Sequence, residues 1–209
     1  MESDWSVAAT ADDPLIETTW SDARSGLAWS DLTTGDESEQ QRRIAALPEA
    51  ALSPAMQHAL TLLNTPGGLL LTTKCDRWLM SEGERADHAE LLDAAAMMHG
   101  FGSYIDVLIA HPLPLCDFLL HEEWARAVAR TAAAVSIDNA RMEIVIRPAH
   151  HSGIWGFGLS VYCFGVGADQ ALAESVWSAC LDAVIPILMR KLEELVPAAN
   201  KKAPRAMSC

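Results

Sequence analysis

Two stretches in the last third of the chain alternate between apolar and polar residues with a period of two. In ARMEIVIRP, the residues Met142, Ile144 and Ile146 fall on one side. In the stretch 154–164, the large apolar residues face one side, while Ser160, Tyr162 and two glycines face the other. This alternation is typical of strands with one buried face. The two stretches therefore predict an antiparallel hairpin joined by AHHSG.

Helical spacing dominates before this hairpin. Ser53-Pro54 predicts a helix start, with a serine N-cap and a proline in the first turn. Ser81 and Glu84 have the spacing of a capping box. The helices that we expect between residues 39 and 135 have their apolar faces at Met56, Leu60 and Leu63, at Leu91, Leu92, Ala95 and Met98, at Tyr104, Ile105, Leu108 and Ile109, at Leu115, Phe118 and Leu119, and at Trp124, Val128 and Ala132.

Three further features complete the predicted elements. Gly100 follows the second of these helices and is expected to be its C-cap in a left-handed conformation. The stretch LLLTTKCDRWLM fits either a strand or an apolar helix. A last helix is expected from about Asp169 to Val196, with a kink or break at Pro186.

These elements predict an α+β fold, made mainly of short packed α-helices with a small antiparallel β-hairpin or sheet before a long C-terminal helix. The 209 residues suit a single folded domain. We expect an acidic, poorly ordered N-terminal arm at residues 1–38, a single helix-rich α+β domain at residues 39–197 and a basic, frayed tail at residues 198–209.

Charge is distributed unevenly along the chain. The formal net charge is −13, and residues 1–39 hold ten acidic residues against the single base Arg24. An acidic protein is a poor match for nucleic acid or for an anionic membrane surface, and it suits a basic protein partner. The candidate partner-binding residues are the tryptophans of the arm and exposed acids of the body: Trp5, Trp20, Trp29, Glu90, Asp93, Glu122 and Glu123.

The residues that could act in catalysis or bind a metal do not have the spacing of any common catalytic or metal-binding motif. His99, His111, Cys116 and His121 lie close together, but their spacing matches no common zinc motif. No nucleophile motif or phosphate-binding loop is present. Five widely spaced cysteines, without a CxxC pair, are typical of a reducing cytoplasm. We therefore expect no catalytic residues, no metal and no cofactor.

Two parts of the sequence resemble a known family. LLDAAAMMHG, followed by YIDVLIAHPLPLCDFLLHEEWARAV, is similar to the type III secretion sorting-platform adaptors, the SctK, YscK and PscK group. ARMEIVIRP and the final QALAESVWSACLDAVIPILMRKL are similar to the end of those proteins. The resemblance covers about Leu91 to Leu195.

The resemblance implies a non-enzymatic cytoplasmic adaptor. Such an adaptor links the cytoplasmic domain of the inner-membrane ring protein (SctD-like) to the pod protein (SctQ-like), without inserting into the membrane itself and without a cofactor. Two alternatives stay open. One is an acidic secretion or assembly chaperone, and the other is a small cytoplasmic enzyme whose site the sequence does not reveal.

Overall fold

The computed structural model describes residues 1–8, 10, 12–22, 27–51, 53–92 and 99–202. These residues form an α+β fold that ends in a long helix, as the sequence predicts. The elements, in chain order, are β1 (Glu2–Val7), β2 (Ile16–Glu17), β3 (Ser21–Asp22), β4 (Leu27–Ala28), α1 (Glu37–Ala45), α2 (Pro48–Ala51), α3 (Pro54–Leu63), β5 (Leu70–Leu79), α4 (Glu82–Leu92), β6 (His99–Ile109), α5 (Pro112–Cys116), α6 (Phe118–Ala133), β7 (Ala140–His151), β8 (Ile154–Gly167) and α7 (Gln170–Lys202).

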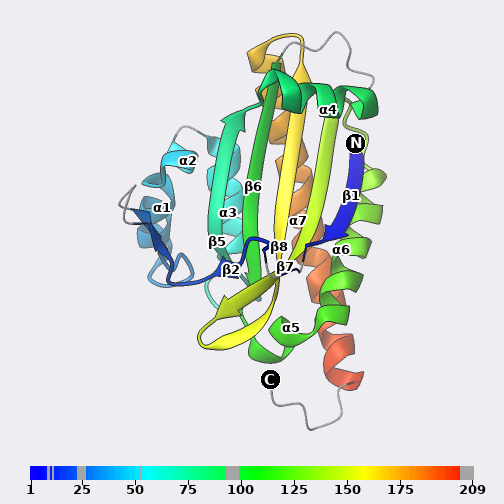
Figure 1. Cartoon of the computed structure of the whole chain (residues 1–209). Coiled ribbons are helices and arrows are strands. Elements are labelled where there is room, and N and C mark those ends of the chain that lie inside the picture. The colour runs from blue at the N-terminus through cyan, green and yellow to red at the C-terminus, as the bar shows by residue number, and fades with distance from the viewer. Residues whose placement is uncertain (9, 11, 23–26, 52, 93–98, 203–209) are drawn as a thin grey trace.

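The centre of the molecule is a mixed sheet in the order β1-β7-β8-β6-β5, with β2 also paired to β7 (Figure 1). The hairpin β7–β8 is confirmed, and its last pair joins His151 to Ile154. Ser152 and Gly153 make the turn, with φ of 52° and 81°. The expectation of only a small hairpin is wrong, because β5, β6 and the N-terminal strands extend it on both sides.

Helices α3, α6 and α7 cover one face of this sheet (Figure 1). The alternating positions of the hairpin, such as Ile144 and Val161, form the main core beneath them. Helix α7 lies so close to β8 that a Cβ on Gly165 would come within 2.2 Å of the Trp177 backbone nitrogen. The Trp177 indole donates to Ser103 Oγ at 2.8 Å, which satisfies two buried polar groups at once.

Helix α7 has the length and composition of a membrane span, with a mean hydropathy of 1.5 in its most apolar window. Core helices of globular proteins meet the same test. Here Cys180, Val184 and Leu188 are fully buried against the rest of the fold. The helix also continues through Pro186, so the predicted break there does not occur.

The largest error of the sequence prediction lies at β6. Tyr104, Ile105, Leu108 and Ile109 were expected on a helix, but they belong to a central strand paired with β5 and β8. The strand is buried on both faces, which replaces the usual alternation by a nearly continuous apolar run. Such a run can imitate one face of a helix when it is short.

Gly100 has a different role from the one predicted. It lies inside β6, opposite Val166 of β8, and it is not among the glycines with positive φ. A Cβ at this position would come within 2.6 Å of Met80 Sδ and 3.1 Å of Met80 Cβ. The glycine therefore makes room for a neighbouring side chain and does not end a helix.

The N-terminal residues are part of the sheet and do not form a separate arm. Strand β1 pairs in parallel with β7 along its whole length, from Glu2 opposite Arg141 to Val7 opposite Ile146. Ile16 of β2 is buried on the second face of the sheet, beside Leu71 and Leu108. The boundary predicted at residue 38 is therefore wrong, because backbone pairing joins these residues to the body.

Several local predictions are confirmed. Ser53 caps α3 by accepting a hydrogen bond from the Met56 amide, and Met56, Leu60 and Leu63 are buried. The capping box at α4 is reciprocal: the Ser81 amide donates to Glu84 Oε2, and the Glu84 amide donates to Ser81 Oγ. The ambiguous stretch after α3 is the strand β5.

Candidate interaction site

Strand β5 is the last strand on its side of the sheet, and the N-terminal segment covers only part of its outer edge. The Trp29 indole donates to the Thr72 carbonyl at 3.2 Å, and the Trp20 indole donates to the Thr73 carbonyl at 2.8 Å. The Thr72 amide donates to the side chain of Asn64 at 2.9 Å. Two of the predicted partner-binding tryptophans therefore act inside the molecule, where they cap the first half of this edge.

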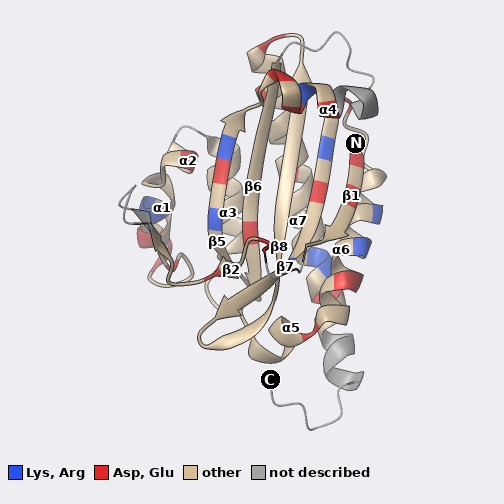
Figure 2. Cartoon of the chain, viewed as in Figure 1, with Lys and Arg blue, Asp and Glu red and all other residues tan. Residues whose placement is uncertain are grey.

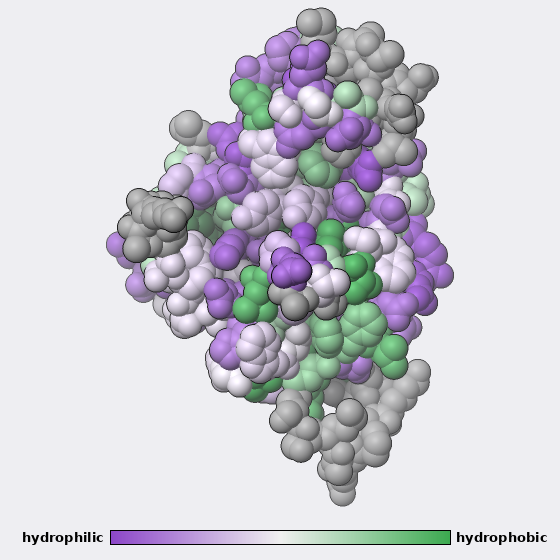
Figure 3. Space-filling model, viewed as in Figure 1, coloured by the Kyte–Doolittle hydropathy of each residue, from purple (hydrophilic) through white to green (hydrophobic). Residues whose placement is uncertain are grey.

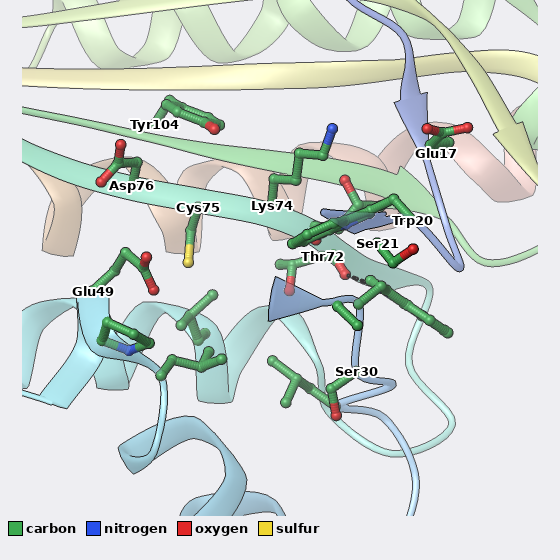
Figure 4. Close-up of a pocket in the computed structure, with 17 residues that line it drawn as sticks. Glu17, Trp20, Ser21, Ser30, Glu49, Thr72, Lys74, Cys75, Asp76 and Tyr104 are labelled. Atoms are coloured by element: carbon green, nitrogen blue, oxygen red, sulfur yellow. Dashed lines mark hydrogen bonds between the residues drawn. The ribbon is translucent and has the colours of Figure 1, made fainter. Parts of the chain in front are cut away.

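A cavity of about 440 Å³ lies beside this edge (Figure 4). It opens between β5, helix α2 and the small hairpin β3–β4, and Cys75 and Glu49 point into it. Its charged lining among the described residues consists of three carboxylates and one ammonium: Glu17, Glu49, Asp76 and Lys74. The Lys74 ammonium lies over the Trp20 ring, 5.3 Å from its centroid. The cavity is therefore acidic and lined by aromatic surface.

The thiol of Cys75 is held in its neutral form. Burial raises its pKa to about 12, and the negative charges of Glu49, Asp76 and Asp106 add to this effect. A nucleophilic or metal-binding cysteine needs the opposite environment, with a cation or a helix N-terminus nearby. Cys75 contributes apolar surface to the cavity and is a poor nucleophile.

A line of polar side chains crosses the sheet face that α3, α6 and α7 leave uncovered. Arg147 Nε donates to Ser160 Oγ at 3.0 Å, and Ser160 donates in turn to Asp106 Oδ1 at 2.6 Å. Burial raises the pKa of Asp106 to about 6, and the hydrogen bond from Ser160 and the charges of Lys74 and Arg147 oppose this shift. The sequence pattern placed Ser160 on the correct side of its strand.

Four aromatic rings form a band above this polar line. Trp78, Tyr104, Tyr162 and Phe164 come from three neighbouring strands, with centroids 5.8 to 6.4 Å apart. The Trp78 indole donates to Glu84 Oε1 of α4 at 3.1 Å. Trp78, Tyr104 and Tyr162 remain partly exposed. Figure 3 views this face and shows polar and intermediate surface over the strands, with hydrophobic surface gathered lower down.

The other predicted partner-binding residues lie apart from this face. Trp5 of β1 packs against the main core, and the Arg126 guanidinium lies 5.5 Å from its ring centroid. Glu122 forms an ion pair with Arg126, and Glu123 is exposed on the same helix, α6. The side chain of Glu90 and the whole of Asp93 lie outside the described residues. The predicted residues that the structure describes are therefore not gathered into one site.

The histidines and cysteines of the central stretch are also dispersed. His121 is fully buried, and its Nδ1 contacts the Asp117 carbonyl at 2.8 Å. Burial lowers its pKa, which keeps the ring neutral. His99 begins β6 and His111 precedes α5 at the opposite end of that strand. Within the described parts of the chain, no three His, Cys, Asp or Glu side chains converge in a way that could hold a metal ion.

The sequence analysis named Trp20 and Trp29 as candidate binding residues, but no other residue that lines the cavity or forms the aromatic band. Lys74, Asp76 and Trp78 point to one side of β5 because they alternate along TKCDRW, and this alternation was the available signal. A bulge between Thr72 and Cys75 interrupts the period and hides it. Glu49 joins the site only through the packing of α2, which no local pattern reveals.

No protein-family model, curated protein or solved structure matches this chain.

Proposed function

We propose that this protein is a non-catalytic protein-binding module, and that its binding surface is the uncovered sheet face together with the edge of β5. The observation that carries the proposal is the aromatic band beside charged strands. Aromatic side chains provide large contact areas at protein interfaces, and Trp and Tyr are enriched among the residues that dominate binding energy. Figure 2 shows acidic and basic residues along strands β5 and β7.

We further propose that the module works as the adaptor of a type III secretion system, between the cytoplasmic domain of the ring protein and the pod protein. Its support is the sequence resemblance over about Leu91 to Leu195 and the acidic charge of the chain. Within that resemblance, the sequence predicted a helix at YIDVLI, but this stretch is part of the strand β6. The support from this stretch therefore lies in its sequence and not in its secondary structure.

A secretion chaperone is the second candidate, and the unpaired outer edge of strand β5 favours it. A free strand edge binds extended chain, as an unfolded secretion substrate would present. An adaptor, in contrast, binds folded domains. The two candidates therefore differ in the conformation of the partner.

Capture by the immobilised full chain tests both candidates. The probes are the purified ring-protein cytoplasmic domain, the purified pod protein and an unfolded secretion substrate from the same bacterium. An adaptor retains the first two, and a chaperone retains the substrate. Retention of none of the three would contradict the proposal of a binding module in secretion.

Charge reversal on the proposed surface provides the matched control. Asp76→Lys changes an exposed residue of β5, and Asp182→Lys makes the same change on the exposed side of α7. Because charges at interfaces select partners and raise association rates, we expect Asp76→Lys to weaken capture about tenfold and Asp182→Lys to leave it unchanged. Equal effects of the two variants would place the interface elsewhere.

A further inference from the structure

The N-terminal segment covers the outer edge of β5 only as far as Thr73. The Met80 amide donates to the Gly100 carbonyl, which fixes the alternation of the ladder with β6. By this alternation, the backbone groups of Asp76 and Trp78 face β6, and those of Cys75, Arg77 and Leu79 face away from it. The Arg77 amide donates to the Asp76 carboxylate at 2.7 Å. Among the described residues, no other hydrogen bond reaches the outward-facing peptide groups of Cys75, Arg77 and Leu79, so no second strand pairs with them. Half of the edge is therefore open to another strand.

The cavity lies directly beside this open half and has the chemistry of a cation site. Cys75 and Asp76 belong to both features, since they are strand residues and line the cavity. Carboxylates and the rings of Trp20 and Trp29 are the groups that attract an ammonium or a guanidinium, through charge and through cation–π contact. Lys74 already uses the Trp20 ring in this way.

One buried polar atom of the lining lacks a partner. Thr73 is 6% exposed and lines the cavity, and its Oγ1 has no hydrogen-bond partner. Buried hydroxyl groups in folded proteins nearly always have a partner, because an unsatisfied one costs about 1 to 3 kcal/mol. A donor that a bound chain brings into the cavity would satisfy this oxygen.

We propose that β5 receives an extended polypeptide segment as a further strand, and that this segment inserts one Arg or Lys side chain into the cavity. The inference rests on the proposed binding surface and specifies the chemistry of its partner, which presents an extended segment either as an unfolded chain or as an exposed part of a folded domain. The segment pairs with Cys75, Arg77 and Leu79. Its basic side chain lies beside Glu49 and the two tryptophans, and its neighbouring side chains face Trp78 and Tyr104.

Charge complementarity distinguishes this occupant from a second copy of the chain. Pairing of two β5 edges would bring together two acidic cavities, since each has three carboxylates and one ammonium among its described lining residues. Like charges facing each other disfavour association. A basic segment meets the same surface with opposite charge.

Four capped peptides added to the full-length protein test the proposal. The first is Thr-Val-Thr-Arg-Thr-Val-Thr, and in the second and third its arginine is replaced by citrulline or glutamate. The fourth keeps the arginine and carries methyl groups on alternate backbone nitrogens. Binding is followed by tryptophan fluorescence and by amide chemical shifts along β5. We expect the arginine peptide to bind about fivefold more tightly than the citrulline peptide, and the glutamate and N-methylated peptides to bind weakest.

Variants of the protein test the cavity itself. Glu49→Gln should weaken binding of the arginine peptide about threefold and leave the citrulline peptide unchanged. Glu123→Gln, an exposed acid on α6, is the matched control and should change neither. If the protein fails to capture the secretion components but still binds the arginine peptide, the proposed role in type III secretion is contradicted and this inference stands.

Three results would overturn the inference. The first is equal binding of the arginine, citrulline and glutamate peptides, or no binding of any of them. The second is undiminished binding of the N-methylated peptide, which would exclude backbone pairing. The third is a dimer in sedimentation whose amide protection covers Cys75 to Leu79, since a second copy would then occupy the edge.

Discussion

At the scale of single residues, the roles of two residues depend on tertiary packing, where the sequence pattern had suggested a role in local backbone conformation. Gly100 was predicted as a helix cap, and its absent side chain instead accommodates Met80 within a strand pair. Asp106 was part of a presumed helix, and it is a buried carboxyl that ends a polar line from Arg147. In both cases the deciding neighbour is distant in the sequence.

Gly100→Ala should lower the free energy of unfolding by about 1 to 2 kcal/mol, because the new Cβ forces Met80 to move in a packed region. Gly83→Ala is the matched control. It lies in α4, where nothing stands within 4 Å of the added Cβ, and alanine favours helix by up to about 1 kcal/mol. Denaturant midpoints measure both variants. Equal stability of Gly100→Ala and the wild type would mean that Met80 does not restrict this position.

Asp106 should make stability depend on pH. Its pKa in the folded state, about 6, is above the ordinary value near 3.9, so folding favours the protonated form. The corresponding stability is present below pH 4 and is lost as the pH rises through 6. Between pH 4 and pH 7, the stability of Asp106→Asn relative to the wild type should therefore increase by about 2 to 3 kcal/mol.

Chemical denaturation of both proteins across this pH range isolates the contribution of Asp106, since all other groups are shared. A constant difference between the two proteins would contradict burial as the dominant influence on this carboxyl. It would mean that Lys74 and Arg147 offset the burial fully.

At the scale of elements, the sequence predicted those helices and strands that depend on residues close together in the chain. It did not predict strands that pair with segments far away in the chain. The hairpin β7–β8 and the caps of α3 and α4 depend on neighbouring residues, and all were predicted. Strand β6 is buried on both faces, which removes its alternation. Strand β1 pairs with a strand more than a hundred residues away, and its polar sequence ESDWSV has no apolar run to mark it.

Removal of residues 1–8 should lower the free energy of unfolding by about 2 to 4 kcal/mol, because it removes a ladder and the contacts of Trp5 with the core. Trp5→Ala should reproduce much of this loss. Val7→Ala, on the same strand but 45% exposed, should cost well under 1 kcal/mol. Thermal unfolding compares the three proteins. An unchanged transition after truncation would show that β1 is only appended to the sheet.

At the scale of the whole molecule, the two faces of the sheet differ in how far other elements cover them. Helices α3, α6 and α7 bury one face and supply the stability of the fold. The other face has only partial cover from the N-terminal segment and α4, and it retains aromatic and charged residues (Figures 1 and 2). The sequence led us to expect an acidic binding protein, and the strand order was needed to locate the surface that we propose for binding.

Amide hydrogen exchange along β5, measured on the full chain with and without its captured partner, tests the central claim most directly. In the free protein, the amides of Cys75 and Leu79 should exchange faster than those of Asp76 and Trp78, which face β6. The bound partner should slow these two outward-facing amides at least tenfold. Unchanged exchange along β5, with new protection on α6 around Glu122 and Glu123, would contradict the claim and place the interface on the helical layer.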